Sequence, residues 1–163
     1  MTDRTALLAA TAPLLDFISG LDLSKPDAAK TALLIRFPVD SSPLQALQTL
    51  VRDGVAAGWL CDRVAGDVRF SRVQKADPAG TRGATWSIDA VHMHGPGAGH
   101  THPQGEVDLC FAVAGAPQFD GQPAGWTVYA PGTWHVPTVS GGAMDILYFL
   151  PGGAIRFEER PTT

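Results

Sequence analysis

The segment VHMHGPGAGHTHPQGEVDLCF, positions 91–111, is the most informative about the architecture. It holds four of the five histidines of the chain. Within this segment His100 and His102 are two positions apart, and Glu106 follows the short bend Pro103-Gln104-Gly105. Side chains two apart in an extended segment point to the same side, and the bend can return the carboxylate to the same place. This spacing indicates a group of metal ligands.

The fifth histidine supplies a candidate fourth ligand. His135 stands in APGTWHVPTVSGG, residues 130–142, where a Pro-Gly turn ends a predicted strand from Trp126. Imidazole and carboxylate together suit divalent Fe, Mn, Ni, Zn or Cu better than Ca or Mg, and they leave room for a substrate. A single histidine is more often a structural residue, but the four side chains together favour a divalent transition metal.

The hydrophobic period of the chain changes near residue 58. Before it, apolar residues recur at helical spacing over three segments, 5–19, 26–37 and 43–57. Pro13 is expected to kink or divide the first of these helices. From Trp59 onward the period is two, in short runs between Gly and Pro turns, with the clearest strands at 86–94, 107–113, 126–129, 144–150 and 154–157.

This pattern predicts a mainly β fold. We expect residues 59–163 to form a jelly-roll or small barrel, and residues 1–58 to form an N-terminal helical segment packed on it. The helix at 43–57 with a following hairpin would also suit half of a winged-helix DNA reader, but Asp53, Asp62 and Asp67 offset the nearby arginines.

Composition narrows the class of protein further. A chain of 163 residues with a formal net charge of −4 fits one compact domain without a basic surface for nucleic acid. Its two cysteines are too few for a disulfide framework, no apolar run reaches the ~20 residues that span a bilayer, and the first residues lack a secretion signal. We expect a cytoplasmic protein with neither a nucleic-acid nor a membrane partner.

Two further histidines lie in the strand that begins at Trp86. Alternation places its even positions on one face, which we expect to be the barrel interior, and its odd positions on the opposite face. His92 and His94 belong to the even face and are candidate catalytic residues, as general acid or base at the barrel mouth. Hydrogen bonding to a metal ligand, contact with a substrate and a purely structural role are the alternatives.

Both histidine segments resemble the cupin superfamily. Its first motif is Gly, five residues, His-x-His, three or four residues, Glu, six residues, Gly, and its second ends in Pro-x-Gly-x-x-His-x-x-x-Asn. When the chain is aligned with these motifs, the resemblance implies that His100, His102, Glu106 and His135 are the four metal ligands. The chain departs from the pattern in its loops, since the glycine after Glu106 is displaced to Gly115, Pro131 directly precedes Gly132, and Val139 replaces the final Asn.

With its helical third included, the chain is similar over most of its length to the 4-hydroxylaminobenzoate lyase family. The resemblance implies a metal-dependent conversion of 4-hydroxylaminobenzoate to 3,4-dihydroxybenzoate (protocatechuate) with release of ammonia, in the degradation of nitroaromatic acids. Substrate plus one water balances the products, so no external redox cofactor is needed. Because cupins commonly pair through sheet edges, the resemblance also implies a homodimer or larger homo-oligomer.

Candidate substrate contacts follow from the flat, aromatic and anionic shape of a small aromatic acid. Trp86 and Trp134 are candidates to line the ring, and Arg82 is a candidate for the carboxylate, with Arg72 and Arg69 as further arginines of this kind. The inward parity of Asp108, Cys110 and Ala112 after Glu106 predicts small side chains that leave cavity space.

Two other functions stay open. The same ligand set supports other metal-dependent cupin enzymes, such as a dioxygenase or an isomerase acting on a small aromatic acid. A non-catalytic, ligand-sensing cupin is the second alternative.

Overall fold

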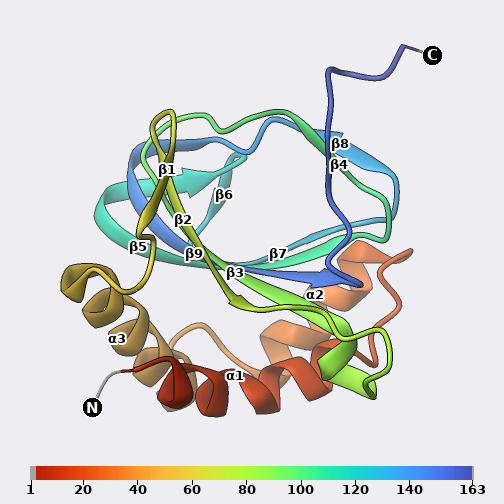
Figure 1. Cartoon of the computed structure of the whole chain (residues 1–163), viewed down its shortest axis with the longest axis horizontal. Helices are drawn as coiled ribbons and strands as arrows, with labels where there is room; N and C mark the ends of the chain where they lie inside the picture. The colour runs from red at the N-terminus through yellow and green to blue at the C-terminus, as the bar shows by residue number, and fades with distance from the viewer. Residues whose placement is uncertain (1–2, 163) are drawn as a thin grey trace.

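The computed structural model describes residues 3–162, and its architecture is mainly β, as predicted (Figure 1). A larger sheet has the strand order β1-β2-β3-β9-β5-β6, with β7 also paired to β5, and a smaller sheet has the order β10-β4-β8. Neighbouring strands are antiparallel. The strands are β1 (Arg63–Ala65), β2 (Val68–Gln74), β3 (Trp86–Met93), β4 (His100–His102), β5 (Glu106–Phe119), β6 (Gln122–Pro123), β7 (Gly125–Tyr129), β8 (Thr133–His135), β9 (Val139–Pro151) and β10 (Arg156–Phe157).

Three helices lie along one side of the larger sheet, and the smaller sheet lies on its other side (Figure 1). They are α1 (Arg4–Ile18), α2 (Pro26–Arg36) and α3 (Ser42–Ala57), close to the predicted ranges. Pro13 lies inside α1 without dividing it. A short 3-10 helix, η1 (Arg82–Thr85), leads into β3. Between residues 3 and 162, no helix combines the length and the apolar character needed to cross a membrane.

The larger sheet separates two apolar clusters. The cluster on the helix side contains Leu47 of α3 together with Ile88 and Ala90 of β3, whereas Val91 and Met93 belong to the cluster inside the barrel. The odd positions of β3 therefore face the interior and the even positions face the helices. The prediction that the even positions face the barrel interior was wrong. Both faces of this strand are buried, and alternation alone does not tell which of them is the interior.

The inward parity predicted for β5 is confirmed for Cys110, whereas Ala112 is exposed and none of Asp108, Cys110 and Ala112 lines the cavity described below. Cys110 lies in the interior cluster, while Val107 and Leu109 pack on the helix side. Since α1, α2 and α3 share that helix-side core with the sheet, the N-terminal segment covers the barrel wall from outside. The boundary between residues 58 and 59 stays a prediction.

Candidate metal centre

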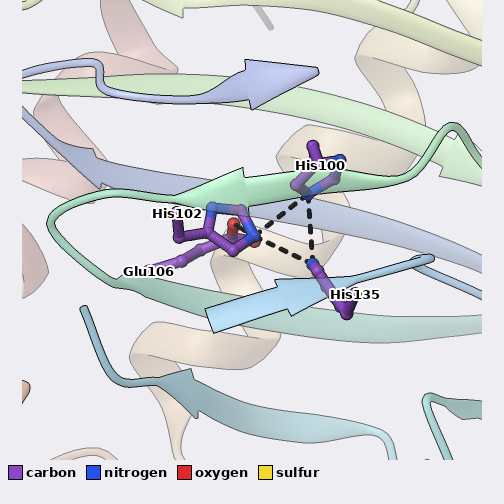
Figure 2. A group of neighbouring side chains, drawn as sticks. All are labelled: His100, His102, Glu106 and His135. Carbon is purple, nitrogen blue, oxygen red and sulfur yellow. Dashed lines mark hydrogen bonds and ion pairs between the residues drawn. The ribbon is translucent and has the colours of Figure 1, made fainter. Parts of the chain in front are cut away.

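Four side chains from three strands meet inside the barrel (Figure 2). His100 and His102 lie on β4, Glu106 begins β5, and His135 ends β8. Antiparallel pairing of β4 with β8 sets His100 opposite His135, which brings the distant histidine alongside the other two. One ligand atom from each residue lies within 4.8 Å of the others. The structure thus brings together the four side chains predicted as metal ligands.

The three imidazoles turn their Nε2 atoms toward one another. These atoms are 3.0 Å apart between His100 and His102, 2.8 Å between His102 and His135, and 3.1 Å between His135 and His100. Nδ1 of His100 lies 2.9 Å from the carbonyl oxygen of Ala98, which only accepts, so this Nδ1 carries the proton. Nδ1 of His135 likewise donates to the Asp120 carboxylate at 2.7 Å. In neutral rings, the Nε2 atoms of His100 and His135 therefore present lone pairs to each other.

Lone pairs in this arrangement call for a cation. Nε2 of His102 is also 2.5 Å from Oε2 of Glu106, yet neither Glu106 oxygen has a hydrogen bond of acceptable geometry. Desolvation, aided by the neighbouring imidazoles, lowers the pKa of His100 to about 4 and that of His102 to about 2. Protons on these two rings therefore do not supply the charge near neutral pH. A metal ion would satisfy the three nitrogens and the carboxylate together, so the residues fit a divalent transition metal.

A second buried carboxyl adds to this demand for positive charge. Asp108 follows Glu106 by two residues on β5, and both side chains are fully buried. Burial raises the pKa of both groups, and repulsion from Glu106 raises that of Asp108 further. No lysine or arginine is buried in the described part of the chain to balance them. Binding a cation beside Glu106 would lower this electrostatic cost.

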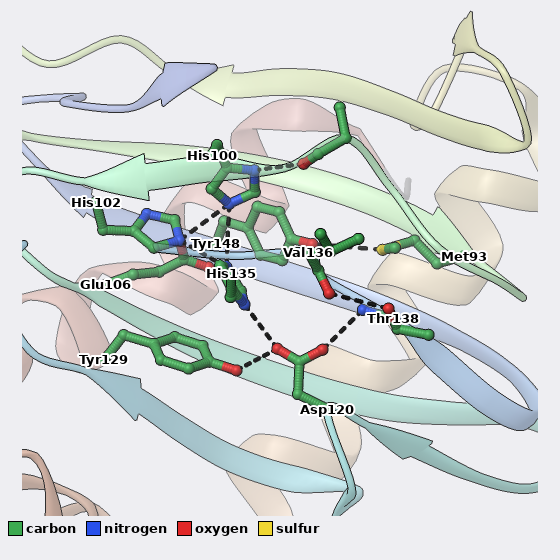
Figure 3. Close-up of polar contacts among 11 residues, drawn as sticks. Met93, His100, His102, Glu106, Asp120, Tyr129, His135, Val136, Thr138 and Tyr148 are labelled. Atoms are coloured by element: carbon green, nitrogen blue, oxygen red, sulfur yellow. Dashed lines mark hydrogen bonds and ion pairs between the residues drawn. The ribbon is translucent and has the colours of Figure 1, made fainter. Parts of the chain in front are cut away.

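Asp120 fixes the orientation of His135 and was not predicted from the sequence (Figure 3). Its Oδ2 accepts from Nδ1 of His135 and from the Tyr129 hydroxyl, and its Oδ1 accepts from the backbone N–H of Thr138 at 2.7 Å. Burial alone would raise the pKa of Asp120, but these hydrogen bonds outweigh it and hold the pKa below its usual range. The only signal in the sequence is Asp120-Gly121, an ordinary turn dipeptide.

A cavity of about 610 Å³ extends from His100 through the barrel interior. Its walls are mostly apolar and include the side chains of Phe70, Val91, Met93, Tyr148 and Phe157. Three basic residues and one acidic residue also line it, namely Arg63, Arg72, Lys75 and Asp89. The space therefore suits a small, flat molecule with a negative charge.

The predicted catalytic histidines lie outside this cavity. His92 is on the helix-facing side of β3, where its Nδ1 is 2.8 Å from Oδ1 of Asp145, and His94 is exposed just after the strand. Neither belongs to the four-residue group, and neither lines the cavity. Their roles in proton transfer stay predictions.

The predicted substrate contacts are scattered. Trp86 is buried in the helix-side core, and Arg82 is exposed and paired with Asp16 of α1. Trp134 lies beside a smaller cavity of about 400 Å³, which His135 also lines. Of the arginines considered, Arg72 lines the larger cavity, whereas Nε of Arg69 donates to the Cys61 carbonyl.

A small antiparallel barrel that encloses a three-histidine, one-glutamate group defines a protein of the cupin class. A family model described as "PnbB: 4-hydroxylaminobenzoate lyase" matches residues 10–157. A 4-hydroxylaminobenzoate lyase of Pseudomonas putida is 34% identical, with 73% of this chain and 76% of that protein covered. One from Nocardioides sp. is 32% identical, with 69% and 70% covered. The chain belongs to the 4-hydroxylaminobenzoate lyase family and is an enzyme of the lyase class.

Solved structures resemble the barrel more distantly. An RmlC-like cupin protein from Ralstonia eutropha is 13% identical with a TM-score of 0.44, and covers 58% of this chain and 62% of its own. A protein with a double-stranded β-helix domain from Klebsiella pneumoniae is 20% identical with a TM-score of 0.42, and covers 60% of this chain and 90% of its own. The homo-oligomer and the cytoplasmic location that we expected from the sequence are not tested by these comparisons and stay predictions.

Proposed function

We propose that this chain converts 4-hydroxylaminobenzoate and water to 3,4-dihydroxybenzoate and ammonia, with a divalent transition metal held by His100, His102, Glu106 and His135. The names of its two relatives support the reaction. The observation that carries the proposal is the convergence of three imidazole Nε2 atoms and a carboxylate beside a cavity that is lined by apolar and basic side chains.

The overall reaction needs no external oxidant or reductant. Substrate and one water together contain the atoms of both products. The electrons balance as well, because cleavage of the N–O bond accompanies oxidation of the ring. When bound, the metal would act as a Lewis acid toward the hydroxylamino oxygen or would lower the pKa of a water molecule.

The residues of the chain have separate tasks in this proposal. The apolar walls of the cavity hold the aromatic ring and exclude bulk water. Asp120 keeps the His135 proton on Nδ1, so that Nε2 stays available as a ligand. His92 and His94 stay candidates for proton transfer, which mutation has to test, because neither lines the cavity.

The decisive experiment measures metal content and products on the purified protein under nitrogen. We expect stoichiometric metal, together with ammonia and 3,4-dihydroxybenzoate in equal amounts from 4-hydroxylaminobenzoate. His102→Ala should lose metal and turnover together, whereas His94→Ala should keep the metal. Turnover by metal-free His102→Ala would overturn the metal role. A requirement for oxygen would favour a dioxygenase instead, and bound ligand without turnover would favour a sensing protein.

A further inference from the structure

The larger cavity carries positive charge that the metal centre does not explain. Its lining holds three basic side chains against one acidic side chain, although the whole chain has a net charge of −4. Arg63 and Lys75 form no ion pair with any carboxylate in residues 3–162. A cavity of this kind attracts an anion, because its basic side chains outnumber its acidic one.

Arg72 is the basic residue best prepared to bind that anion. Its Nε lies 2.6 Å and its Nη2 3.3 Å from the two carboxylate oxygens of Asp89, whose side chain is only 18% exposed. These contacts fix the plane of the guanidinium and leave the N–H groups of Nη1 to a ligand. Arg72, Arg63 and Lys75 are all exposed, but only Arg72 is held by an ion pair with a carboxylate. Less conformational entropy is therefore lost when Arg72 binds an anion than when Arg63 or Lys75 does.

The position of Arg72 also fits a ligand that has two different ends. In the sheet register, Arg72 pairs with Asp89, Asp89 with Tyr148, and Tyr148 with Asp108, so one row of interior side chains crosses four strands. Three steps between strands separate Arg72 from Asp108 by about 14 Å along the sheet. Glu106, two residues from Asp108, belongs to the metal group. Arg72 and His100 line the same cavity from different strands.

We propose that Arg72, held by Asp89, binds the carboxylate of the aromatic acid and thereby directs the opposite substituent of the ring toward His100 and the metal group. The proposal rests on the proposed function for the identity of the substrate. It makes Arg72 a specificity-determining residue that selects ring acids with a carboxylate para to the reacting nitrogen. Arg63 and Lys75 contribute long-range attraction without fixing the orientation.

The kinetic test compares two substrates in two proteins. N-phenylhydroxylamine has the reacting group of 4-hydroxylaminobenzoate but lacks the carboxylate. Arg72→Gln should lower kcat/KM for 4-hydroxylaminobenzoate by on the order of 10- to 100-fold, as expected for a lost charge-assisted pair, and should leave N-phenylhydroxylamine unchanged. Arg52→Gln, which removes an exposed arginine of α3 outside the cavity, is the matched control. Equal losses on both substrates would overturn the proposal.

A binding test separates this proposal from the proposed function. We would titrate 4-aminobenzoate and aniline by calorimetry into protein freed of metal with a chelator, so that the carboxylate cannot bind a metal. Only 4-aminobenzoate should lose affinity in Arg72→Gln, even if the wild-type protein shows no lyase activity. The double variant Arg72→Gln/Asp89→Asn, which leaves no unpaired Asp89, should show the same loss. Wild-type affinity for 4-aminobenzoate in either variant would refute the role of Arg72.

Discussion

Replacing Asp120 by asparagine should weaken metal binding while keeping the shape of the side chain. The carboxylate accepts three hydrogen bonds, from His135 Nδ1, the Tyr129 hydroxyl and the Thr138 backbone N–H. Asparagine offers one oxygen and an NH₂ group that only donates. The NH₂ group must therefore take the place of one carboxylate oxygen, where it meets another hydrogen-bond donor.

Both orientations of the new amide have a cost. If its NH₂ group faces Thr138, a backbone N–H in a half-buried position loses its partner, at about 1–3 kcal/mol. If its NH₂ group faces His135, the imidazole must move its proton from Nδ1 to Nε2, the atom that turns toward the other histidines. Loss of such a partner typically costs 10- to 100-fold in metal affinity, which is about 1.4–2.8 kcal/mol.

The assay is competition for Zn²⁺ against a chromophoric chelator, with thermal unfolding of the metal-free protein measured in parallel. Tyr129→Phe is the matched control, because it removes one hydrogen bond to Asp120 but leaves the carboxylate on His135. We expect it to lose much less affinity than Asp120→Asn. Wild-type affinity in a normally folded Asp120→Asn protein would refute the reasoning from the His135 tautomer.

Three further results are expected. Metal at about 1,000 times its Kd should stabilise the wild-type protein by about 4 kcal/mol and raise its Tm by roughly 8–16 °C in calorimetry, and His102→Ala should abolish this shift. Gly142→Ala should destabilise the fold by about 3 kcal/mol or more in urea unfolding, because the new Cβ would lie 1.9 Å from the Ala114 carbonyl oxygen at a φ of +157°; wild-type stability would contradict this. The two buried cysteines should resist iodoacetamide at pH 8 until urea is added, as followed by mass spectrometry, since burial raises the pKa of Cys61 to about 12; rapid alkylation of the native protein would contradict it.

Three of the four proposed ligands were predictable because their signals are local. His100, His102 and Glu106 lie within seven consecutive positions, so strand alternation and one bend are enough to group them. His135 needed the resemblance to a known motif, because only the pairing of β4 with β8 brings it close. The mainly β fold and the three helices followed in the same way from periodicity along the chain.

Neither Asp120 nor the choice of Arg72 among the candidate arginines could be predicted in this way. Asp120 reaches His135 from a turn whose composition fits any hairpin, and Arg72 is singled out among the arginines by the register of β2 on β3. Both depend on pairing between separate strands, which cannot be deduced from the order of residues within one strand.

The two histidines of the β3 region show a different limit of alternation. A period of two assigns side chains to two faces, but it identifies the interior only when the other face is polar. In β3 the helix-facing side holds Ile88 and Ala90, and the cavity side holds Val91 and Met93, so both faces are apolar. His92 lies on the helix side because the Asp145 carboxylate, opposite it on β9, provides a partner there. The partner across the sheet therefore explains the position of this histidine better than its own sequence neighbours do.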